Sequence, residues 1–136
     1  MRNEIVKRNV TKMSIYAGPG VLVHEGRQIS SLHRHEELEF LPIYSGLFHC
    51  YSESGARYDA TAGDVIFVNS GVPHATACED ETQSGLLQFR QKDFLDTEIE
   101  RVIRYSSRLD SLSDDGVRVL RDPTLFSAIN GIFAEI

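Results

Sequence analysis

Cysteines and long apolar runs are both scarce in this sequence. Only two cysteines, Cys50 and Cys78, occur in 136 residues, too few for a disulfide framework, so both are interpreted as reduced, small apolar side chains. No segment approaches the about 20 apolar residues that a bilayer-spanning helix needs. Basic residues near the start are followed by no apolar stretch typical of a signal peptide. We therefore expect a cytoplasmic protein that does not span a membrane.

Positive charge is also in short supply. The sequence has 14 basic and 20 acidic residues, a formal net charge of −6. A surface field of this sign repels phosphate backbones, so this stretch alone is not expected to bind DNA. The sequence also lacks a glycine-rich phosphate loop before a helix, a cysteine pattern typical of a zinc module and a serine in a nucleophile-elbow sequence. Those classes are set aside.

Short strands separated by turn residues dominate the first ninety residues. The chain has the length of one domain that can bury its own core. We expect strands at residues 13–17, 21–24, 38–44, 47–51, 57–60, 64–69, 74–78 and 85–90. Glycine-containing turns at 18–20, 45–46, 52–55 and 69–71 separate them. Regular short strands of this kind are typical of a β-sandwich or barrel.

After residue 95 the pattern changes to that of helices. Thr97 and Glu100 have capping-box spacing and predict one helix start, while Asp122 and Pro123 predict another. A short strand is expected at 117–120. We divide the chain into a barrel at 1–95 and a helical segment of the same domain at 96–136. Because the last helix stops on an apolar position without a cap or polar tail, we expect the protein to continue beyond Ile136.

One short stretch carries the candidate site. His33, His35 and Glu39 share one parity, so on an extended strand their side chains point to the same face. His74 follows a Gly/Pro turn and begins another alternating strand, which we expect to deliver it from beside the first. Three imidazoles and one carboxylate suit a divalent ion such as zinc, nickel, iron or manganese, and they leave coordination positions of the ion open. His24 and His49 lack a partner at ligand spacing and are not expected to bind the ion.

The same alternation predicts the surroundings of this site. Leu41 and Ile43 continue the inner face, and with Phe67 they are expected to form the apolar walls of a small-molecule pocket. Leu38 and Phe40, on the opposite face, would be covered by the C-terminal helices. An alternative needs no metal. The four polar side chains form a hydrogen-bonded pocket that binds an organic effector, or they simply satisfy one another's hydrogen bonds.

The spacing of these residues resembles the two motifs of the cupin superfamily. The first motif is filled by Gly26, His33, His35, Glu39 and Gly46, with one extra residue after Gly26, and the second by Gly63, Asp64, Gly71 and His74. Asn69 and Cys78 depart from the second motif, which usually has proline and asparagine there. The resemblance implies a mainly β fold, a jelly-roll-like barrel followed by α-helices, with all four ligand positions filled.

Within the cupins, about residues 15–136 resemble the N-terminal sensor domain of AraC-type transcription regulators. The similarity rests on residues 33–40, 69–74, 87–89 and 94–95 and on the helices that follow. It implies a small-effector site, for which the candidate residues are His33, His35, Glu39, Leu41, Ile43, Phe67 and His74. It also implies a homodimer formed through the helices. DNA would be bound by two helix-turn-helix motifs in a C-terminal part outside this chain.

Two functions compete on this basis. In the leading interpretation the chain is a ligand-sensing and dimerisation domain and not an enzyme, and its effector favours one arrangement of the outer helices. The alternative is a metal-dependent cupin enzyme, a dioxygenase or isomerase acting on a small organic substrate. A purely structural or storage barrel would leave the ligand set without a purpose.

Overall fold

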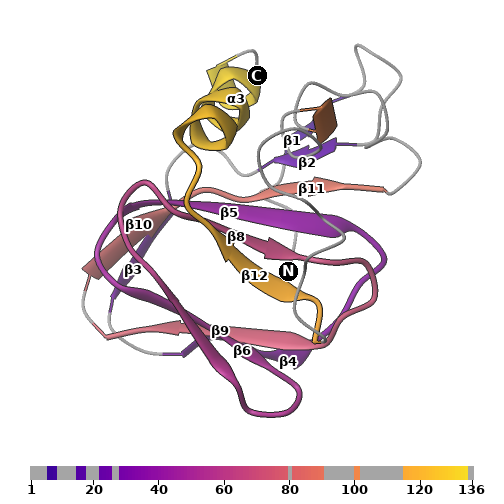
Figure 1. The fold of residues 1–136 in the computed structure, drawn as a ribbon, viewed down its shortest axis with the longest axis vertical. Helices are drawn as coiled ribbons and strands as arrows, with labels where there is room; N and C mark the ends of the chain where they lie inside the picture. The colour runs from indigo at the N-terminus through magenta and orange to yellow at the C-terminus, as the bar shows by residue number, and fades with distance from the viewer. Residues whose placement is uncertain are drawn as a thin grey trace.

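Two antiparallel sheets face each other, and a helix packs on the outside of the larger one (Figure 1). The computed structural model describes residues 6–8, 15–17, 22–25, 28–79, 81–90, 100–101 and 115–134. The larger sheet has eight strands and the smaller sheet has four. The expected mainly β fold with a C-terminal helix is therefore confirmed.

The larger sheet is built around its longest strand. Its order is β1 (Val6–Arg8), β2 (Ile15–Ala17), β11 (Leu87–Phe89), β5 (Leu38–Ser45), β10 (Glu81–Ser84) and β3 (Leu22–Glu25), and β8 (Val65–Val68) pairs with both β5 and β12 (Val117–Leu120). Strand β5 pairs with β8 along one edge and with β11 and β10 along the other. Since β12 lies beyond residue 95, the C-terminal segment contributes a strand to the sheet as well as a helix.

The smaller sheet forms the opposite wall. Its order is β4 (Gln28–His33), β9 (His74–Cys78), β6 (Phe48–Ser52) and β7 (Arg57–Ala60). Along β9, His74, Thr76 and Cys78 are buried, whereas the two alanines between them are half-buried. This is the period of two that the sequence predicts for a strand with one face toward the interior.

The position of strand β4 differs from what the sequence predicts for the stretch that contains the histidines. The segment was not expected to form a strand, because its polar residues show no apolar alternation and it lies at an edge of the smaller sheet. It ends at His33, residues 34–37 cross between the sheets, and Glu39 lies on β5 of the larger sheet. The prediction that His33, His35 and Glu39 share one strand is therefore wrong. Strands β1 and β10 were also not predicted.

Helix α3 (Pro123–Ala134) begins where the sequence predicts. The Asp122 carboxylate accepts hydrogen bonds from the backbone N–H groups of Thr124 at 2.9 Å and Leu125 at 3.2 Å, which satisfies two of the donors at the helix start. Of the helix predicted from Thr97, only Glu100 and Arg101 lie within the described residues, and both are helical. Within the described ranges, no helix combines the length and apolar character required to cross a membrane.

Strand β8 is apolar on both faces, and β5 and β11 turn apolar side chains toward α3, because both faces of the sheet are covered. On the outer face, one cluster joins strand residues to Leu125 and Ile129 of α3; its strand members are Leu38, Phe40, Val65, Phe67, Leu87, Phe89 and Leu120. A second cluster fills the barrel between the sheets with Leu41, Ile43, Phe48, Cys50, Ala60, Ile66, Val68 and Val117. The expectation that the C-terminal helix covers Leu38 and Phe40 is thus confirmed.

Phe67 lies on the other side of the sheet from the place that the sequence predicts. In the antiparallel register it is paired with Phe40, and the two ring centroids are 4.9 Å apart under helix α3. Paired residues share a face, so Ile66 and Val68 point into the barrel and Phe67 points away from it. The assignment of Phe67 to a pocket wall is therefore corrected. A continuous apolar run such as residues 65–68 gives no periodic sign of which members face inward.

Both cysteines are buried free thiols, as the sequence predicts. Burial, with the negative charges of Glu39 and Asp115, raises the pKa of Cys50 to about 12. Because the thiolate is the reactive form, we expect no modification of the folded protein by Ellman's reagent at about pH 8. Two thiols should react once the protein is unfolded in guanidinium. The variant Ser127→Cys, on an exposed position of α3, should react rapidly and serves as the control. Rapid labelling of the folded protein without the substitution would contradict the burial of these thiols.

Candidate metal centre

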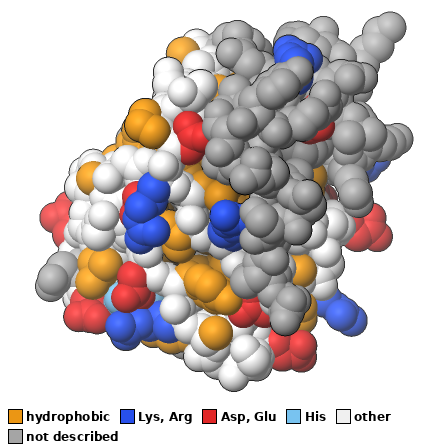
Figure 2. Space-filling model, in the orientation of Figure 1, with side chains coloured by type: hydrophobic (Ala, Val, Ile, Leu, Met, Phe, Trp, Pro, Cys, Tyr) orange, Lys and Arg blue, Asp and Glu red, His pale blue; other side chains and the backbone are white. Residues whose placement is uncertain are grey.

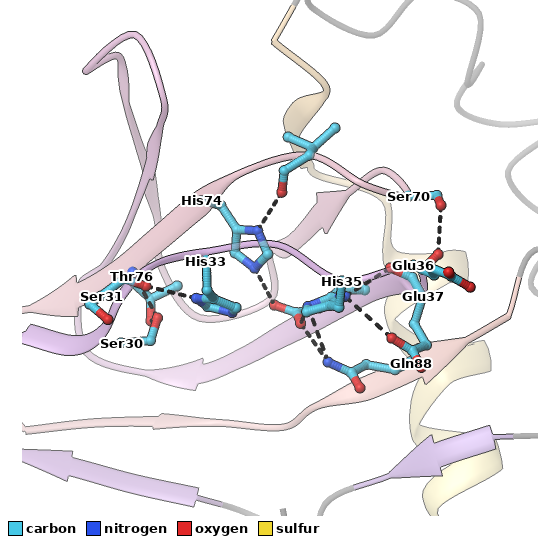
Figure 3. A network of polar contacts seen from close by, with 12 residues as sticks. Ser30, Ser31, His33, His35, Glu36, Glu37, Ser70, His74, Thr76 and Gln88 are labelled. Carbon is cyan, nitrogen blue, oxygen red and sulfur yellow. Dashed lines mark hydrogen bonds and ion pairs between the residues drawn. The ribbon is translucent and has the colours of Figure 1, made fainter. Parts of the chain in front are cut away.

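Three histidines from separate parts of the chain meet between the sheets (Figure 3). His33 ends β4 and is paired in register with His74 at the start of β9, while His35 lies in the crossing segment. The ring centroid of His74 lies 4.4 Å from that of His33 and 5.2 Å from that of His35. One nitrogen from each of the three rings can be chosen so that all lie within 4.8 Å of one another. The predicted convergence of the three imidazoles is observed.

The backbone orients all three rings in the same way. The Nδ1 of each ring faces a carbonyl oxygen two residues away: Ser31 for His33 at 2.7 Å, Glu37 for His35 at 3.1 Å and Val72 for His74 at 2.8 Å. A carbonyl only accepts hydrogen bonds, so each Nδ1 carries the proton and donates it. The second nitrogen of each ring, Nε2, is thereby left for a ligand. This backbone arrangement is typical of metal-binding histidines.

Glu39 brings a buried carboxylate to the same place. Its Oε1 lies 2.9 Å from His35 Nε2, and its Oε2 lies 3.4 Å from His74 Nε2. The side-chain amide of Gln88 donates a hydrogen bond of 2.7 Å to Oε1. Glu39 is 5% exposed and Gln88 is 4% exposed, so these contacts form away from water. The predicted four-residue set, His33, His35, Glu39 and His74, is therefore assembled in the structure.

Gln88 is the site residue that the sequence analysis missed. It lies on β11 directly opposite Glu39 in register. Its neighbours Leu87 and Phe89 are fully buried under α3, which turns the side chain between them toward the histidines. A single polar residue between two large apolar ones on a predicted strand was the available signal.

The donor set fits a cation. His74 is completely buried, and its Nε2 has no hydrogen-bond partner because the carboxylate oxygen 3.4 Å away lies outside good geometry. A buried nitrogen of this kind costs free energy unless something binds it. The short contact between His35 Nε2 and Glu39 also requires a proton, since two lone pairs repel. A divalent ion bound to the Nε2 atoms of both rings would remove the need for that proton and satisfy His74 at the same time.

Two comparisons with known proteins address the fold. Residues 21–87 match the sequence profile of the cupin domain. This stretch is a cupin domain. Solved structures of similar fold include a cupin-2 domain protein from Shewanella frigidimarina, with a TM-score of 0.50, 14% identity and coverage of 66% of this chain and 83% of that one. A cupin superfamily protein from Desulfitobacterium hafniense gives a TM-score of 0.51 and 12% identity, covering 65% and 80% of the two chains.

A cupin enzyme is also among the similar structures. The oxalate decarboxylase of Bacillus subtilis, whose structure concerns Mn(II) centres, gives a TM-score of 0.50 and 18% identity. The similarity covers 83% of this chain but only 36% of that one. At these identities the likeness shows a common fold and leaves the activity open. A search of curated proteins gives no match to this sequence.

Two opposing influences set the charge of the cupin site. Burial alone would raise the pKa of Glu39, but the hydrogen bond from His35 and the nearby imidazoles of His35 and His74 lower it well below its usual range. Burial would lower the pKa of His74, and the Glu39 carboxylate together with the hydrogen bond to Val72 raises it. The metal-free site thus favours an ionised carboxylate next to a charged imidazole. A metal ion must displace protons to bind here.

The structure also places Leu41, Ile43 and His49, which the sequence analysis considered. Leu41 and Ile43 lie on the inner face of β5, where they pack in the barrel cluster with Phe48, Ile66 and Val68. His49 lies apart from the histidine cluster, and carboxylates engage both of its nitrogens: Asp59 at 2.6 Å and Glu79 at 3.0 Å. It was not expected to be a ligand, and its nitrogens face those two side chains instead.

We expect His33→Gln to abolish tight binding of one divalent ion per chain. His33 is exposed, so the variant should fold normally while losing one of three nitrogen ligands. Loss of an outer contact alone typically costs 10–100-fold in metal affinity, and loss of a ligand should cost more than about 100-fold. Isothermal titration with Ni²⁺ or Zn²⁺ measures the effect. The matched control, His49→Gln, removes a histidine outside the cluster and should bind as the unmodified protein does. Equal loss in both variants would exclude the proposed ligand set.

The pH dependence of stability should report the Glu39–His74 contact in metal-free protein. The lowered pKa of Glu39 gives a contribution that is complete above the ordinary value of 4.5 and is lost as pH falls through the lowered one. The raised pKa of His74 gives one that is complete below 6.5 and is lost as pH rises through the raised value. The loss of unfolding free energy in Glu39→Gln, measured by urea denaturation with chelator present, should be largest between these values. A difference that is constant with pH would argue against the contact.

Proposed function

We propose that this chain is the ligand-sensing and dimerisation domain of an AraC-type transcription regulator. In this proposal His33, His35, Glu39 and His74 hold a divalent ion in the cupin barrel, and a small effector binds at its open positions. When bound, the ion supplies a positive charge that can attract a carboxylate or hydroxyl group of the effector. The cupin domain, the assembled ligand set and the order of motifs along the chain support this assignment.

One observation carries the proposal: the strands that line the site also seat helix α3. On β5, Glu39 faces the histidines while its neighbours Leu38 and Phe40 pack under the helix. On β11, Gln88 faces Glu39 while Leu87 and Phe89 pack under the same helix. A displacement of either polar residue therefore moves apolar side chains that contact α3. A packed core transmits such shifts because it has few voids to absorb them.

Further contacts tie the helix to the same sheet. The Tyr44 hydroxyl, at the far end of β5, donates a hydrogen bond of 2.5 Å to Asn130 Oδ1. The ring of Phe133 lies against Gly85, where an added Cβ would come within 2.7 Å of it. The helix is thus held at several points along its length. A sensor needs a link of this kind, because an effector shifts an equilibrium only through contacts that differ between two states.

The charge of the chain agrees with DNA binding by another part of a regulator. On the face seen in Figure 2, basic and acidic side chains of the described residues are interspersed, without a continuous basic patch there. The whole sequence carries a formal charge of −6. Two helix-turn-helix motifs outside this chain would supply the contact with DNA, in a cytoplasmic homodimer joined through the C-terminal helices.

A cupin enzyme is the second candidate, and the complete ligand set favours it. Three nitrogens and one oxygen leave coordination positions for a substrate, and a buried carboxylate beside them could accept a proton. The two functions differ in what they require of α3. Catalysis needs a rigid site and places no demand on the helix, whereas a sensor must change the helix or its partner surface when its ligand binds.

Metal binding should therefore change the dynamics of α3. We expect saturating Ni²⁺ or Zn²⁺ to slow hydrogen–deuterium exchange of backbone amides in Pro123–Ala134, because a neutralised Glu39 fixes the strand beneath them. Sedimentation equilibrium on the same samples should show a dimer whose affinity changes with metal.

The control for this experiment is His33→Gln, which removes a metal ligand at a position far from the helix. It should therefore show neither effect. Metal binding with unchanged exchange in α3 and unchanged association would exclude a sensor based on these strands. Turnover of a small organic substrate by such a protein would then favour the enzyme.

A further inference from the structure

The amide of Gln88 makes one contact that the ligand set does not explain. Its Nε2 donates to Glu39 Oε1 at 2.7 Å and lies 3.4 Å from His35 Nε2. The orientation of the amide is determined by its surroundings, because turning its oxygen toward the carboxylate would bring two acceptors together. The contact joins two neighbouring strands at positions that are opposite in register.

We propose that Gln88 is a positioning residue of the metal centre, which holds Oε1 of Glu39 and so presents Oε2 alone to the ion. This inference rests on the proposed metal centre. Glu39 Oε2 is the oxygen on the side of His74, at 3.4 Å from its unpartnered Nε2. The Oε1 atom is the one that receives both the Gln88 amide and His35. The two oxygens of one carboxylate therefore already have different roles.

Binding of an ion would make the amide more important. His35 and His74 can bind a metal only through Nε2 lone pairs, so neither could then donate a proton to Glu39. Gln88 needs no such change, because an amide N–H is a donor in both states. Of the two contacts to Oε1 described above, the hydrogen bond from Gln88 is the one that survives metal binding. It would keep the carboxylate from turning to bind through both oxygens and so preserve an open position.

Cobalt titration of three variants tests this role. Gln88→Met keeps the length of the side chain but removes the donor, and we expect it to weaken Co²⁺ binding 10–100-fold, the usual effect of losing an outer hydrogen bond to a metal ligand. The visible spectrum of bound Co²⁺ should also change, because its intensity depends on the number and arrangement of ligands. The matched control is Gln83→Met on β10, a half-exposed glutamine of the same sheet, which should leave affinity and spectrum unchanged.

The outcomes separate this inference from the metal centre itself. Co²⁺ binding by Gln88→Met with the affinity and spectrum of the unmodified protein would overturn the role of Gln88 and leave the centre standing. Absence of Co²⁺ binding in the unmodified protein would overturn both. If Gln88→Met fails to fold, Gln88→Asn provides the test: its amide is one methylene shorter and should bind Co²⁺ more weakly, and binding equal to that of the unmodified protein would overturn the proposal.

Discussion

The strict alternation of side chains along β5 is the constraint on which the other features depend. Successive side chains of β5 point alternately into the barrel and toward α3. Glu39 therefore reaches the histidines only because Leu38 and Phe40 are buried on the opposite side. A shift of register by one residue would turn the large apolar side chains into the barrel and place the carboxylate under the helix. The core that stabilises the fold therefore also fixes the position of the acid in the site.

The backbone determines the chemistry of the histidines with little help from other side chains. Each Nδ1 donates to a carbonyl only two residues away, so the ring orientation is specified locally by His33, His35 and His74 and their own turns. The carboxylate is treated differently, since its partners come from β9, from the crossing segment and from β11. Contacts with nearby carbonyls suit histidines that must offer a lone pair in a fixed direction. Contacts with distant segments, in contrast, make the Glu39 carboxylate responsive to changes elsewhere in the fold.

Much of this arrangement could be predicted from the sequence, and the failures have physical causes. The inner face of β9 and the outer position of Phe40 follow from alternation, and helix α3 follows from the Asp-Pro start. Strand β4 carries polar residues at a sheet edge, so periodicity does not reveal it. Phe67 lies in a continuous apolar run, where inward and outward residues look alike. Gln88 enters the site through strand pairing, a long-range property, and the local pattern shows only a polar residue between two apolar ones.

The position of Gln88 bears on the choice between sensing and catalysis. A residue that only stabilised a catalytic carboxylate could come from any neighbouring element. Here it comes from β11, between Leu87 and Phe89, so the same short strand contacts both Glu39 and the underside of α3. Any reorientation of the carboxylate by an ion or effector must either break a buried hydrogen bond or move that strand. Breaking that bond would leave a buried donor or acceptor unsatisfied, a cost that opposes separation of Gln88 from Glu39. Movement of the strand would reach the helix, and this is the link that the proposed sensor requires.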